Sequence, residues 1–463
     1  MSASPQGGWS GDALRLLEDA RQRGARYLSD LQTRAVAPTA AAIDALRRLD
    51  TPLPAAASPP AQTLALLDEL VSPATAAMAG PRFFGFVIGG SLPAALAANW
   101  LAAVWDQNAA FLAPTPGVAR LEQVALAWLN ELFDFPPGTT GGFVTGATVS
   151  NFTALAAARH AVLARAGWNV ESDGLFGAPP ITVVVGGEAH PSLTKALGML
   201  GLGRSRVVRV PVDSQGRMRA DALPAIQGPT ICCLQAGNVN TGASDPFASL
   251  IPKAHEHGAW VHVDGAFGLW AKVSARHRAQ VQGVELADSW ATDAHKWLNV
   301  PYDSGIAFVR DQQSLAAAMA VTAVTADYLP GAGLGRAPCD YTPELSRRAR
   351  GVEVWAALHS LGRAGLAELV DRNCAQAREF AARLSASGYE VLNEVVLNQV
   401  LVAFGDDART RRVVTALQAE GTCWCGITVW QGRTAMRISV SNWSTTAADV
   451  ERSIAAMLRL ARA

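Results

Sequence analysis

Short apolar runs alternate with amphipathic segments through the middle of the chain. The runs are apolar at nearly every position, which is typical of strands buried on both faces, and the segments between them carry apolar residues at helical spacing. Strands that alternate with helices favour a mostly parallel sheet covered on both sides. The sequence therefore predicts an α/β fold, with strands within 141–144, 181–190, 207–212, 230–245, 260–267, 287–297 and 304–311.

Helical and mixed patterns flank this region. Residues 13–31 place their apolar positions on one helix face, and a Pro-rich linker at 50–60 precedes a second helical pattern. We expect residues 1–80 to form a helical arm that packs on a second subunit. Residues 81–345 form the predicted large domain, and the mixed pattern of 346–463 predicts a smaller α+β domain.

Composition argues against several kinds of partner. The 463 residues are 50% hydrophobic, and 39 Lys and Arg balance 39 Asp and Glu, so net charge favours neither nucleic acid nor an anionic membrane. The sequence has neither an apolar run of the roughly 20 residues that span a bilayer nor the pattern of a secretory signal at its start. Six cysteines in this length do not make a disulfide framework. We expect a cytoplasmic protein without a metal site.

Two predicted strand ends carry the most specific chemistry. Asp264 ends the run VHVD, and Lys296 follows His295 at the end of DSWATDAHK. A lysine beside a buried strand can lose solvation and attack a carbonyl group as an amine nucleophile. A carboxylate at a neighbouring strand end can hold a protonated pyridine nitrogen. Together they match the requirements of pyridoxal 5′-phosphate (PLP), while a simple ion pair between them is the other interpretation.

Further polar groups belong to the same predicted sheet edge. His190 follows one strand and Asn238–Thr241 follows another. The carboxyl ends of parallel strands meet at one edge, where such sheets bind ligands. His190 can lie flat on a planar ring, and the small side chain of Ala266 leaves room for the opposite ring face. This convergence favours a binding site over unrelated surface groups.

A turn of small residues, Thr145-Gly146-Ala147-Thr148, precedes an Ala-rich helix. Small side chains let backbone N–H groups approach a phosphate, and the helix N-terminus adds free donors and a favourable dipole. An ordinary helix cap is the alternative. The chain lacks the GxGxxG and GxxxxGK[ST] patterns, so dinucleotide and P-loop sites have no support.

Residues 321–345 interrupt the alternation with three glycines and three prolines, which predicts a long loop. The loop carries Tyr328 and Tyr341, and a phenol on such a loop can close over a site and deliver a proton. A surface loop with an anchoring aromatic is the alternative. Further on, Arg437 could bind a substrate carboxylate, but a surface position on its strand is the favoured interpretation.

At HVDGAF and DSWATDAHKW the sequence resembles the PLP-dependent group II amino-acid decarboxylases, which include aromatic amino-acid and glutamate decarboxylases. The resemblance extends from PRFFGF to SRRARG, and more loosely through the C-terminal region. VHVDGA, DAHKW, the small-residue turn and AHPSLTKA together are a specific combination. It implies the aspartate-aminotransferase fold (fold type I), a large domain with a mostly parallel seven-stranded sheet, and a homodimer.

The resemblance also implies a role for each candidate residue. Lys296 would hold PLP as an internal aldimine, Asp264 would pair with the pyridine nitrogen, and His190 would stack on the ring. Tyr341 would return a proton to the substrate carbon. The phosphate would be bound by Gly146, Ala147 and Thr148, joined by Asp293 or His295.

The implied reaction is that of a lyase in amino-acid metabolism, the decarboxylation of an L-amino acid to the amine and CO2. Aromatic amino acids are one candidate substrate class. Another PLP-dependent lyase, or a decarboxylating aldehyde synthase on the same scaffold, is the alternative. The loop tyrosine distinguishes these, because loss of a proton donor can turn decarboxylation into oxidation. The intact Lys296, Asp264 and His190 argue against a non-catalytic scaffold.

Overall fold

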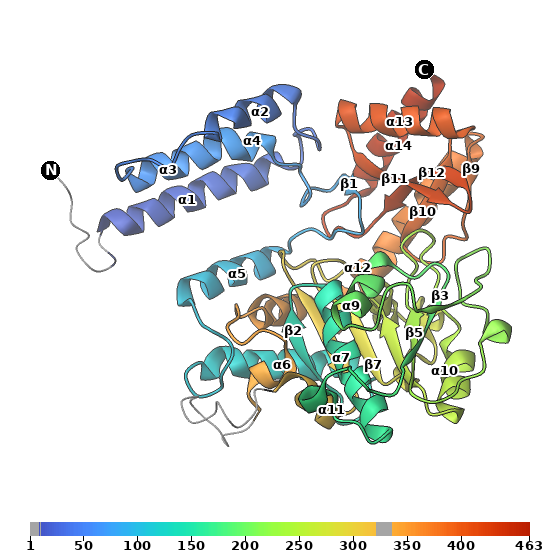
Figure 1. Cartoon of the computed structure of the whole chain (residues 1–463). Coiled ribbons are helices and arrows are strands. Elements are labelled where there is room, and N and C mark those ends of the chain that lie inside the picture. Colours follow the sequence, from blue (N-terminus) through green and yellow to red (C-terminus); the bar gives the residue numbers. More distant parts are fainter. Residues whose placement is uncertain (1–8, 10, 321–335) are drawn as a thin grey trace.

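A seven-stranded sheet forms the centre of the computed structural model, which describes residues 9, 11–320 and 336–463 (Figure 1). Its order is β2-β8-β7-β6-β5-β3-β4, and every strand runs in the same direction except β8. The expected mostly parallel seven-stranded sheet is confirmed. The strands are β2 (Thr140–Val144), β3 (Thr182–Gly186), β4 (Val208–Val210), β5 (Thr230–Gln235), β6 (Trp260–Asp264), β7 (Ser289–Asp293) and β8 (Gly305–Val309).

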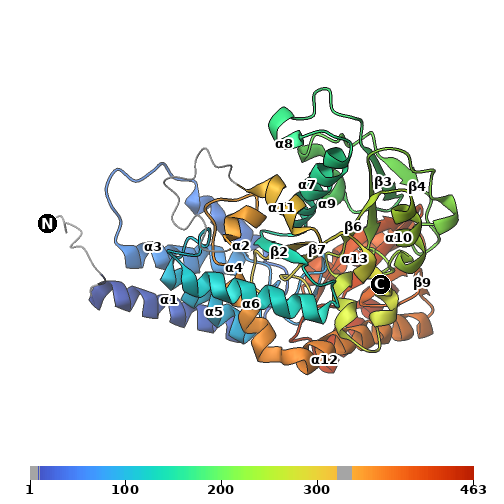
Figure 2. The ribbon, with the colours of Figure 1, turned by 90° about the horizontal axis from the view of Figure 1, so that it is seen from below.

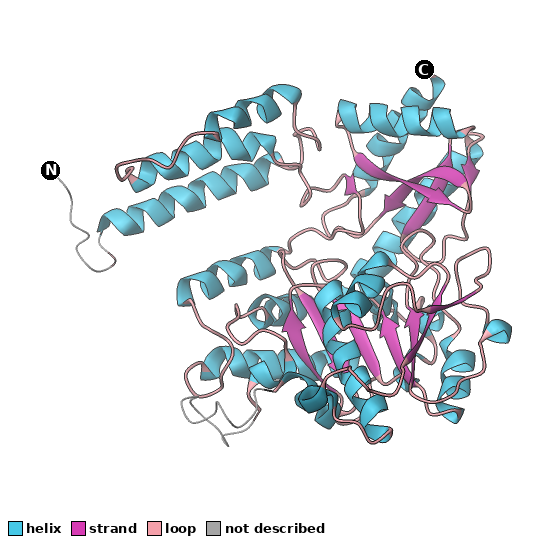
Figure 3. Cartoon of the chain, viewed as in Figure 1, coloured by secondary structure: helices cyan, strands magenta, loops and turns pink. Residues whose placement is uncertain are grey.

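Helices cover both faces of this sheet (Figure 3). Successive side chains of a strand point to opposite faces, so Val183 and Val185 join one apolar core while Val184 joins the other. Both faces need apolar residues, which explains the continuous apolar runs. One core lies under α7 (Ala147–Arg165), α9 (Pro191–Met199) and α11 (Gln312–Met319), and the other under α6 (Pro116–Leu132), α10 (Phe247–Glu256) and α12 (Gly351–Ala386).

The N-terminal helices stand apart from both sheets, at the upper left of Figure 1. Seen from below, α1 runs alongside α5 (Figure 2). A Cβ added at Gly24 of α1 would lie 3.5 Å from the ring of Trp100 on α5. The helices of this region are α1 (Gly11–Asp30), α2 (Ala40–Ala45), α3 (Pro60–Leu66) and α4 (Ser72–Ala74), whereas α5 (Pro93–Trp105) packs against α12 of the large domain.

The C-terminal region folds around a second sheet, of order β1-β11-β12-β10-β9. Strand β1 (Phe83–Phe84) comes from far upstream and pairs in parallel with β11, so residues 83–84 belong to the small sheet. The division at residues 81 and 346 therefore stays a prediction. The remaining elements are β9 (Glu390–Val391), β10 (Gln399–Ala403), β11 (Trp424–Trp430), β12 (Arg433–Ser439), α13 (Asp407–Glu420) and α14 (Ala447–Arg462).

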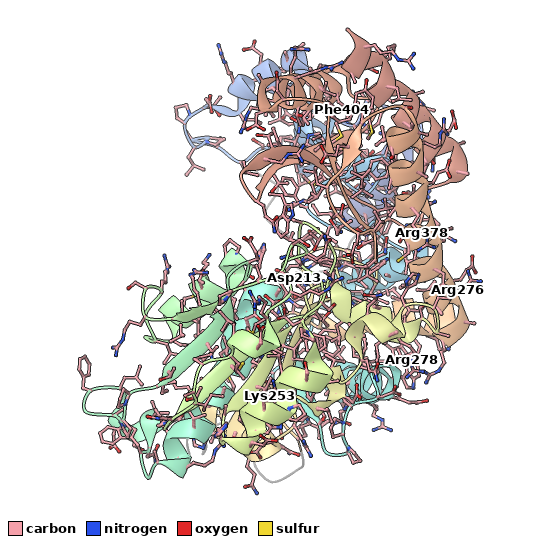
Figure 4. The ribbon with its side chains drawn as sticks, turned by 90° about the vertical axis from the view of Figure 1, so that its right-hand side faces the viewer. Asp213, Lys253, Arg276, Arg278, Arg378 and Phe404 are labelled. Atoms are coloured by element: carbon pink, nitrogen blue, oxygen red, sulfur yellow. The ribbon has the colours of Figure 1, made fainter. Side chains whose placement is uncertain are left out.

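Charged residues join the two sheet domains at their boundary. Arg217 lies 3.3 Å from Asp213 on the large domain and 3.0 Å from Glu394 on the C-terminal domain. Figure 4 shows Asp213 where the two domains meet. Helix α12 links the domains and has a break at Gly362, where φ is +59°. The carboxyl ends of the large sheet consequently face the small domain.

Candidate active site

A cavity of about 260 Å³ opens at the carboxyl ends of β5 and β6. We call it the Lys296 cavity. Four of the residues predicted for the site line it: His190, Asp264, Ala266 and Lys296. They come from separate loops that the parallel sheet brings to one edge, as the sequence pattern indicated. Side chains that were not predicted for the site also line it, among them Phe86, Gln235, Phe267 and Arg437.

Asp293 connects Lys296 to the start of α7. One carboxylate oxygen, Oδ2, lies 3.0 Å from Lys296 Nζ, and the other accepts a hydrogen bond of 2.6 Å from the backbone N–H of Ala147. Asp293 is buried, and its two partners use both of its oxygens. Asp293 thus holds Lys296 beside the turn Thr145–Thr148, for which we predicted a phosphate site.

His295 packs against the same carboxylate. Its Nε2 lies 3.6 Å from Asp293 Oδ1, and its Nδ1 accepts a 3.0 Å hydrogen bond from the backbone N–H of Ser304. Burial lowers the pKa of His295, although the charge of Asp293 opposes that shift. With Nδ1 acting as an acceptor in a neutral ring, the proton sits on Nε2 and faces the site.

The start of α7 is packed too closely for larger side chains. Gly146 precedes the helix and offers no side chain to cap it. A Cβ at Gly146 would lie 3.1 Å from His295 Cε1, and one at Gly305 would lie 2.4 Å from Gly146 Cα. Thr148 is half-buried in the first turn of the helix. The small residues therefore serve close packing and also leave the helix N-terminus open to an anion.

Asp264 is buried at the end of β6 and accepts hydrogen bonds on both oxygens. Asn151 Nδ2 donates to Oδ2 at 3.1 Å, and the backbone N–H of Ala266 donates to Oδ1 at 3.2 Å. Both partners are donors, which is the environment that an ionised carboxylate requires. Asn151 lies on α7, one helical turn after Ala147, so a single helix borders both the Asp264 end and the Lys296 end of the site.

His190 begins α9 and lines the Lys296 cavity. Its Nδ1 accepts a hydrogen bond of 3.2 Å from the backbone N–H of Ser192 and lies 2.7 Å from the hydroxyl of the same residue. Burial lowers the pKa of His190, with the charge of Asp264 acting in the opposite direction. A neutral imidazole with its proton on Nε2 results.

Arg437 lines the Lys296 cavity, so the favoured surface position was wrong. It lies on β12, which sits between β11 and β10 in the small sheet and carries the side chain toward the large domain. Its Nε is buried without a hydrogen-bond partner among the described residues, and burial lowers its pKa. No local pattern on β12 indicates this position, because the contact depends on how the two domains meet.

The loop Asn238–Thr241 contributes less than the strand-end argument predicted. Asn238 Oδ1 accepts the backbone N–H groups of Asn240 and Thr241, at 2.8 and 3.3 Å. Thr241 donates its hydroxyl to the carbonyl of Gln215 at 2.7 Å. These polar atoms hold the loop itself, and only Val239 of the four residues lines the Lys296 cavity.

The structure places Tyr341 away from the Lys296 cavity. Its side chain is 5% exposed and joins the core under α7 and α11. The hydroxyl accepts a hydrogen bond of 2.7 Å from Gln312, and the guanidinium of Arg336 lies 4.0 Å from the ring centroid. Tyr341 is anchored by packing and does not line the Lys296 cavity, and its role as proton donor stays a prediction. Tyr328 lies outside the described residues.

The residues present fit PLP. Lys296 supplies an amine, Asp264 supplies a buried carboxylate at another part of the same cavity, and the start of α7, with the positive end of its dipole, lies beside the amine through Asp293. The helical rise places Ala147 and Asn151 roughly 6 Å apart along α7, which suits a group with an anion at one end and a basic nitrogen at the other.

Comparison with known proteins also indicates a PLP-dependent protein. Residues 44–405 match the pyridoxal-dependent decarboxylase conserved domain. The aromatic-L-amino-acid decarboxylase of Bacillus atrophaeus is 27% identical, over 81% of this chain and 78% of that protein. The L-2,4-diaminobutyrate decarboxylase of Rhizobium meliloti (strain 1021) is 29% identical, over 80% of this chain and 75% of that protein.

The fold has a close counterpart among solved structures. The crystal structure of Oryza sativa TDC with PLP and tryptamine superposes with a TM-score of 0.90, covering 100% of this chain and 99% of that one at 22% identity. The match of the conserved domain covers most of the chain, and the motifs around Asp264 and Lys296 lie inside it. This chain belongs to the family of pyridoxal-dependent decarboxylases.

Proposed function

We propose that this chain removes CO2 from an L-amino acid and releases the amine, using PLP attached to Lys296. Family membership supports the reaction class. One observation carries the proposal: Lys296 and Asp264 line the same cavity as Arg437, a cation that arrives from the other domain. An amine, an anion and a second cation in one cavity suit an amino-acid substrate whose carboxylate needs a partner.

We assign the cofactor contacts as follows. Lys296 would bind the aldehyde carbon, Asp264 would pair with the pyridine nitrogen, and His190 and Ala266 would border the ring. The phosphate would be held at the start of α7 by Gly146 and Thr148 and by His295, which turns a neutral N–H toward the site, while the Ala147 N–H is already bonded to Asp293. Asp293 belongs to the lysine end, because its carboxylate already pairs with Lys296 and would repel a phosphate.

The residues of the cavity then act on the substrate. Arg437 binds the α-carboxylate through its fork of N–H groups, and its unpartnered buried Nε gives it a free donor for that purpose. Phe86, Val239 and Phe267 give the cavity apolar walls that reduce access of water. When bound, PLP supplies an electron-accepting ring that takes up the electron pair left when the carboxylate departs as CO2. Lys296 Nζ and His190 Nε2 are the described groups that can carry a proton at this cavity.

Aromatic amino acids remain one candidate substrate class. Phe86 and Phe267 support an apolar or aromatic side chain, since both line the Lys296 cavity and Phe86 is 53% exposed. The relatives differ in substrate, because one acts on aromatic amino acids and another on 2,4-diaminobutyrate. A panel of substrates is therefore needed.

We also propose that the chain works as a homodimer in the cytoplasm. Apolar side chains of α1, α3 and α5 lie exposed and border a groove of about 510 Å³. A second copy of the same helical arm would cover them. Of the exposed apolar residues in this region, Leu28, Leu67 and Trp100 line the groove, and Leu14, Leu17, Leu66, Leu101 and Trp105 lie outside its lining. Among the described residues, no helix is long and apolar enough to cross a membrane.

Product analysis tests the proposed reaction. PLP-loaded protein would be incubated with aromatic, acidic and diamino L-amino acids, and CO2, amine, aldehyde and ammonia would be followed together by mass spectrometry. Amine equal in amount to CO2 is expected, with Lys296→Ala as the inactive control. Aldehyde and ammonia in place of the amine would instead identify an oxidative aldehyde synthase. Intact cofactor binding with no CO2 from any amino acid would rule out decarboxylation.

A further inference from the structure

A row of buried polar groups runs from Asp264 into the core of the large domain. Trp260, His262 and Asp264 alternate along β6, so all three point to the face that α7 covers. Ser289, on β7, lies directly beside His262 in the sheet register. Asn151, on α7, lies above the same row. All of these side chains except Trp260, at 4% exposed, are 3% exposed or less.

Hydrogen bonds connect the row without a gap. Trp260 Nε1 lies 2.9 Å from Ser289 Oγ, which lies 3.0 Å from His262 Nδ1. His262 Nε2 lies 2.9 Å from Asn151 Oδ1, and Asn151 Nδ2 lies 3.1 Å from Asp264 Oδ2. Four consecutive bonds therefore join the indole of Trp260 to the carboxylate of Asp264.

The Trp260 end of the row begins with a group that can only donate. An indole N–H can only donate, so Ser289 accepts from Trp260, and its own O–H is left free to donate to His262 Nδ1. A neutral imidazole that accepts at Nδ1 must donate from Nε2, and burial lowers the pKa of His262 to about 3, which keeps the ring neutral.

The Asp264 end fixes the direction of donation. An ionised Asp264 can only accept, so Asn151 must turn its amide N–H₂ toward Asp264 and its oxygen toward His262. His262 Nε2 then donates to Asn151, a neutral ring accepts at Nδ1 from Ser289, and the Trp260 end is compatible with this direction. Because all four hydrogen bonds point the same way, their dipoles add, and the positive ends point toward the carboxylate.

We propose that Asn151, His262, Ser289 and Trp260 form a one-way hydrogen-bond relay that orients Asp264 and directs donors at it. The relay acts through Asp264, so its four members are positioning residues. This inference rests on the proposed function only for its effect on turnover. The hydrogen bonds of the relay involve only residues of this chain, so they can be measured without a substrate.

The first test measures the imidazole directly in protein without PLP. Histidines labelled with 15N would be observed by NMR, and the His262 signals would be identified by their loss in His262→Gln. A neutral ring with its proton on Nε2 is expected. A proton on Nδ1, or a doubly protonated ring at neutral pH, would overturn the relay whatever the enzyme activity turns out to be.

The second test removes single donors. Asn151→Asp keeps the size of the side chain but replaces the donor facing Asp264 with an acceptor, and Trp260→Phe removes the first donor. Partners that orient a functional group through one intervening contact typically contribute roughly 10- to 100-fold to affinity or activity. Asn151→Asp should therefore weaken PLP binding by about 10-fold and lower kcat by about 100-fold, with KM changed less than about threefold.

A matched control comes from the opposite face of the sheet. Trp290 is a buried tryptophan on β7 whose indole donates to the carbonyl of Val284 at 2.8 Å, outside the relay. Trp290→Phe should lower stability as Trp260→Phe does, while leaving the His262 signals and the PLP affinity unchanged. If both variants changed PLP affinity equally, the relay would reduce to ordinary core packing. Normal PLP affinity and kcat in a folded Asn151→Asp would also overturn it.

The outcomes separate the relay from the proposed function. A His262 proton on Nε2 with weak PLP binding in Asn151→Asp, but no CO2 from any amino acid, supports the relay and rejects the decarboxylase. If the wild type releases CO2 and amine, and Asn151→Asp keeps the PLP affinity and kcat of the wild type, the decarboxylase is supported and the relay is rejected.

Discussion

The amine of Lys296 lies 3.0 Å from a carboxylate oxygen of Asp293, whose other oxygen holds the first backbone N–H of α7. One buried side chain thus couples the proposed attachment point of the cofactor to the helix end that we assign to its phosphate. Both Lys296 Nζ and the Ala147 N–H lie within hydrogen-bond distance of Asp293, so a substitution of Asp293 should affect both groups.

Asp293→Asn should therefore be milder than Asp293→Ala. The amide keeps an oxygen for the N–H of Ala147 but loses the charge that pairs with Lys296. Alanine also leaves a buried N–H without a partner, at a cost of about 1–3 kcal/mol. We expect PLP retention after dialysis to fall in the order wild type, Asn, Ala, with unfolding midpoints in the same order. Equal losses in the two variants would show that only the charge matters.

Lys296→Ala should abolish covalent attachment of PLP. Borohydride reduction followed by peptide mass spectrometry would locate the attachment, and the test is sharp because the chain has only four lysines. Lys253 is the control: it reaches the carbonyl of Ala220 at 3.3 Å and lies on the outer part of the large domain (Figure 4). Lys253→Ala should label normally. A label on Lys195, Lys253 or Lys272 in the wild type would contradict the assignment.

Arg437→Met should weaken binding of the substrate far more than binding of the product. The amine product lacks the carboxylate that Arg437 is proposed to hold, so inhibition by the amine should be unchanged. A charge-assisted hydrogen bond contributes roughly 1.5–3 kcal/mol, which corresponds to about a 10- to 150-fold rise in KM. Arg433→Met, on the same strand but paired with Glu390 at 2.6 Å and exposed, should leave KM unchanged.

Tyr341→Phe should alter stability rather than the product. The variant removes a hydroxyl that accepts a hydrogen bond from Gln312, and it keeps the ring under Arg336. We expect a loss of about 1 kcal/mol in unfolding free energy, with the amine still formed. If Tyr341→Phe yielded aldehyde and ammonia, the phenol would have to reach a site that it does not reach within the described chain.

His262→Gln tests the neutral buried imidazole through pH. Burial lowers the pKa of His262 from 6.5 to about 3, so the unfolded state takes up a proton between these values that the folded state does not. The stability that the wild type draws from the neutral ring is present above pH 6.5 and is lost as pH falls through that window, by up to about 1.4 kcal/mol per pH unit.

Glutamine does not titrate, so the stability gap between wild type and His262→Gln should narrow from pH 6.5 to 4. Urea unfolding at one protein concentration would measure it. Asp245, whose pKa burial raises to about 6, gives the opposite slope, but it does so in both proteins and cancels in the comparison. A gap that is constant with pH would show that His262 is not buried as a neutral ring.

The amino-acid sequence by itself determined the α/β fold, the seven-stranded sheet and the family. Continuous apolar strands and helical spacing are local properties of the sequence. Strands that are apolar at every position must be buried on both faces, so they predict a parallel sheet covered by helices on both sides. The same logic put His190, Asp264 and Lys296 at one sheet edge, where the structure finds them lining one cavity.

Only the tertiary structure decided what surrounds those residues. Arg437 reaches the cavity because two domains meet there, and no local pattern on β12 indicates that contact. Tyr341 lies outside the Lys296 cavity, because apolar packing under α7 and α11 buries its ring and Gln312 donates a hydrogen bond to its hydroxyl. Asn151 and Asp264 are far apart in the sequence, and their hydrogen bond exists only because α7 lies across β6. Long-range contacts of this kind depend on how elements pack, which local periodicity does not encode.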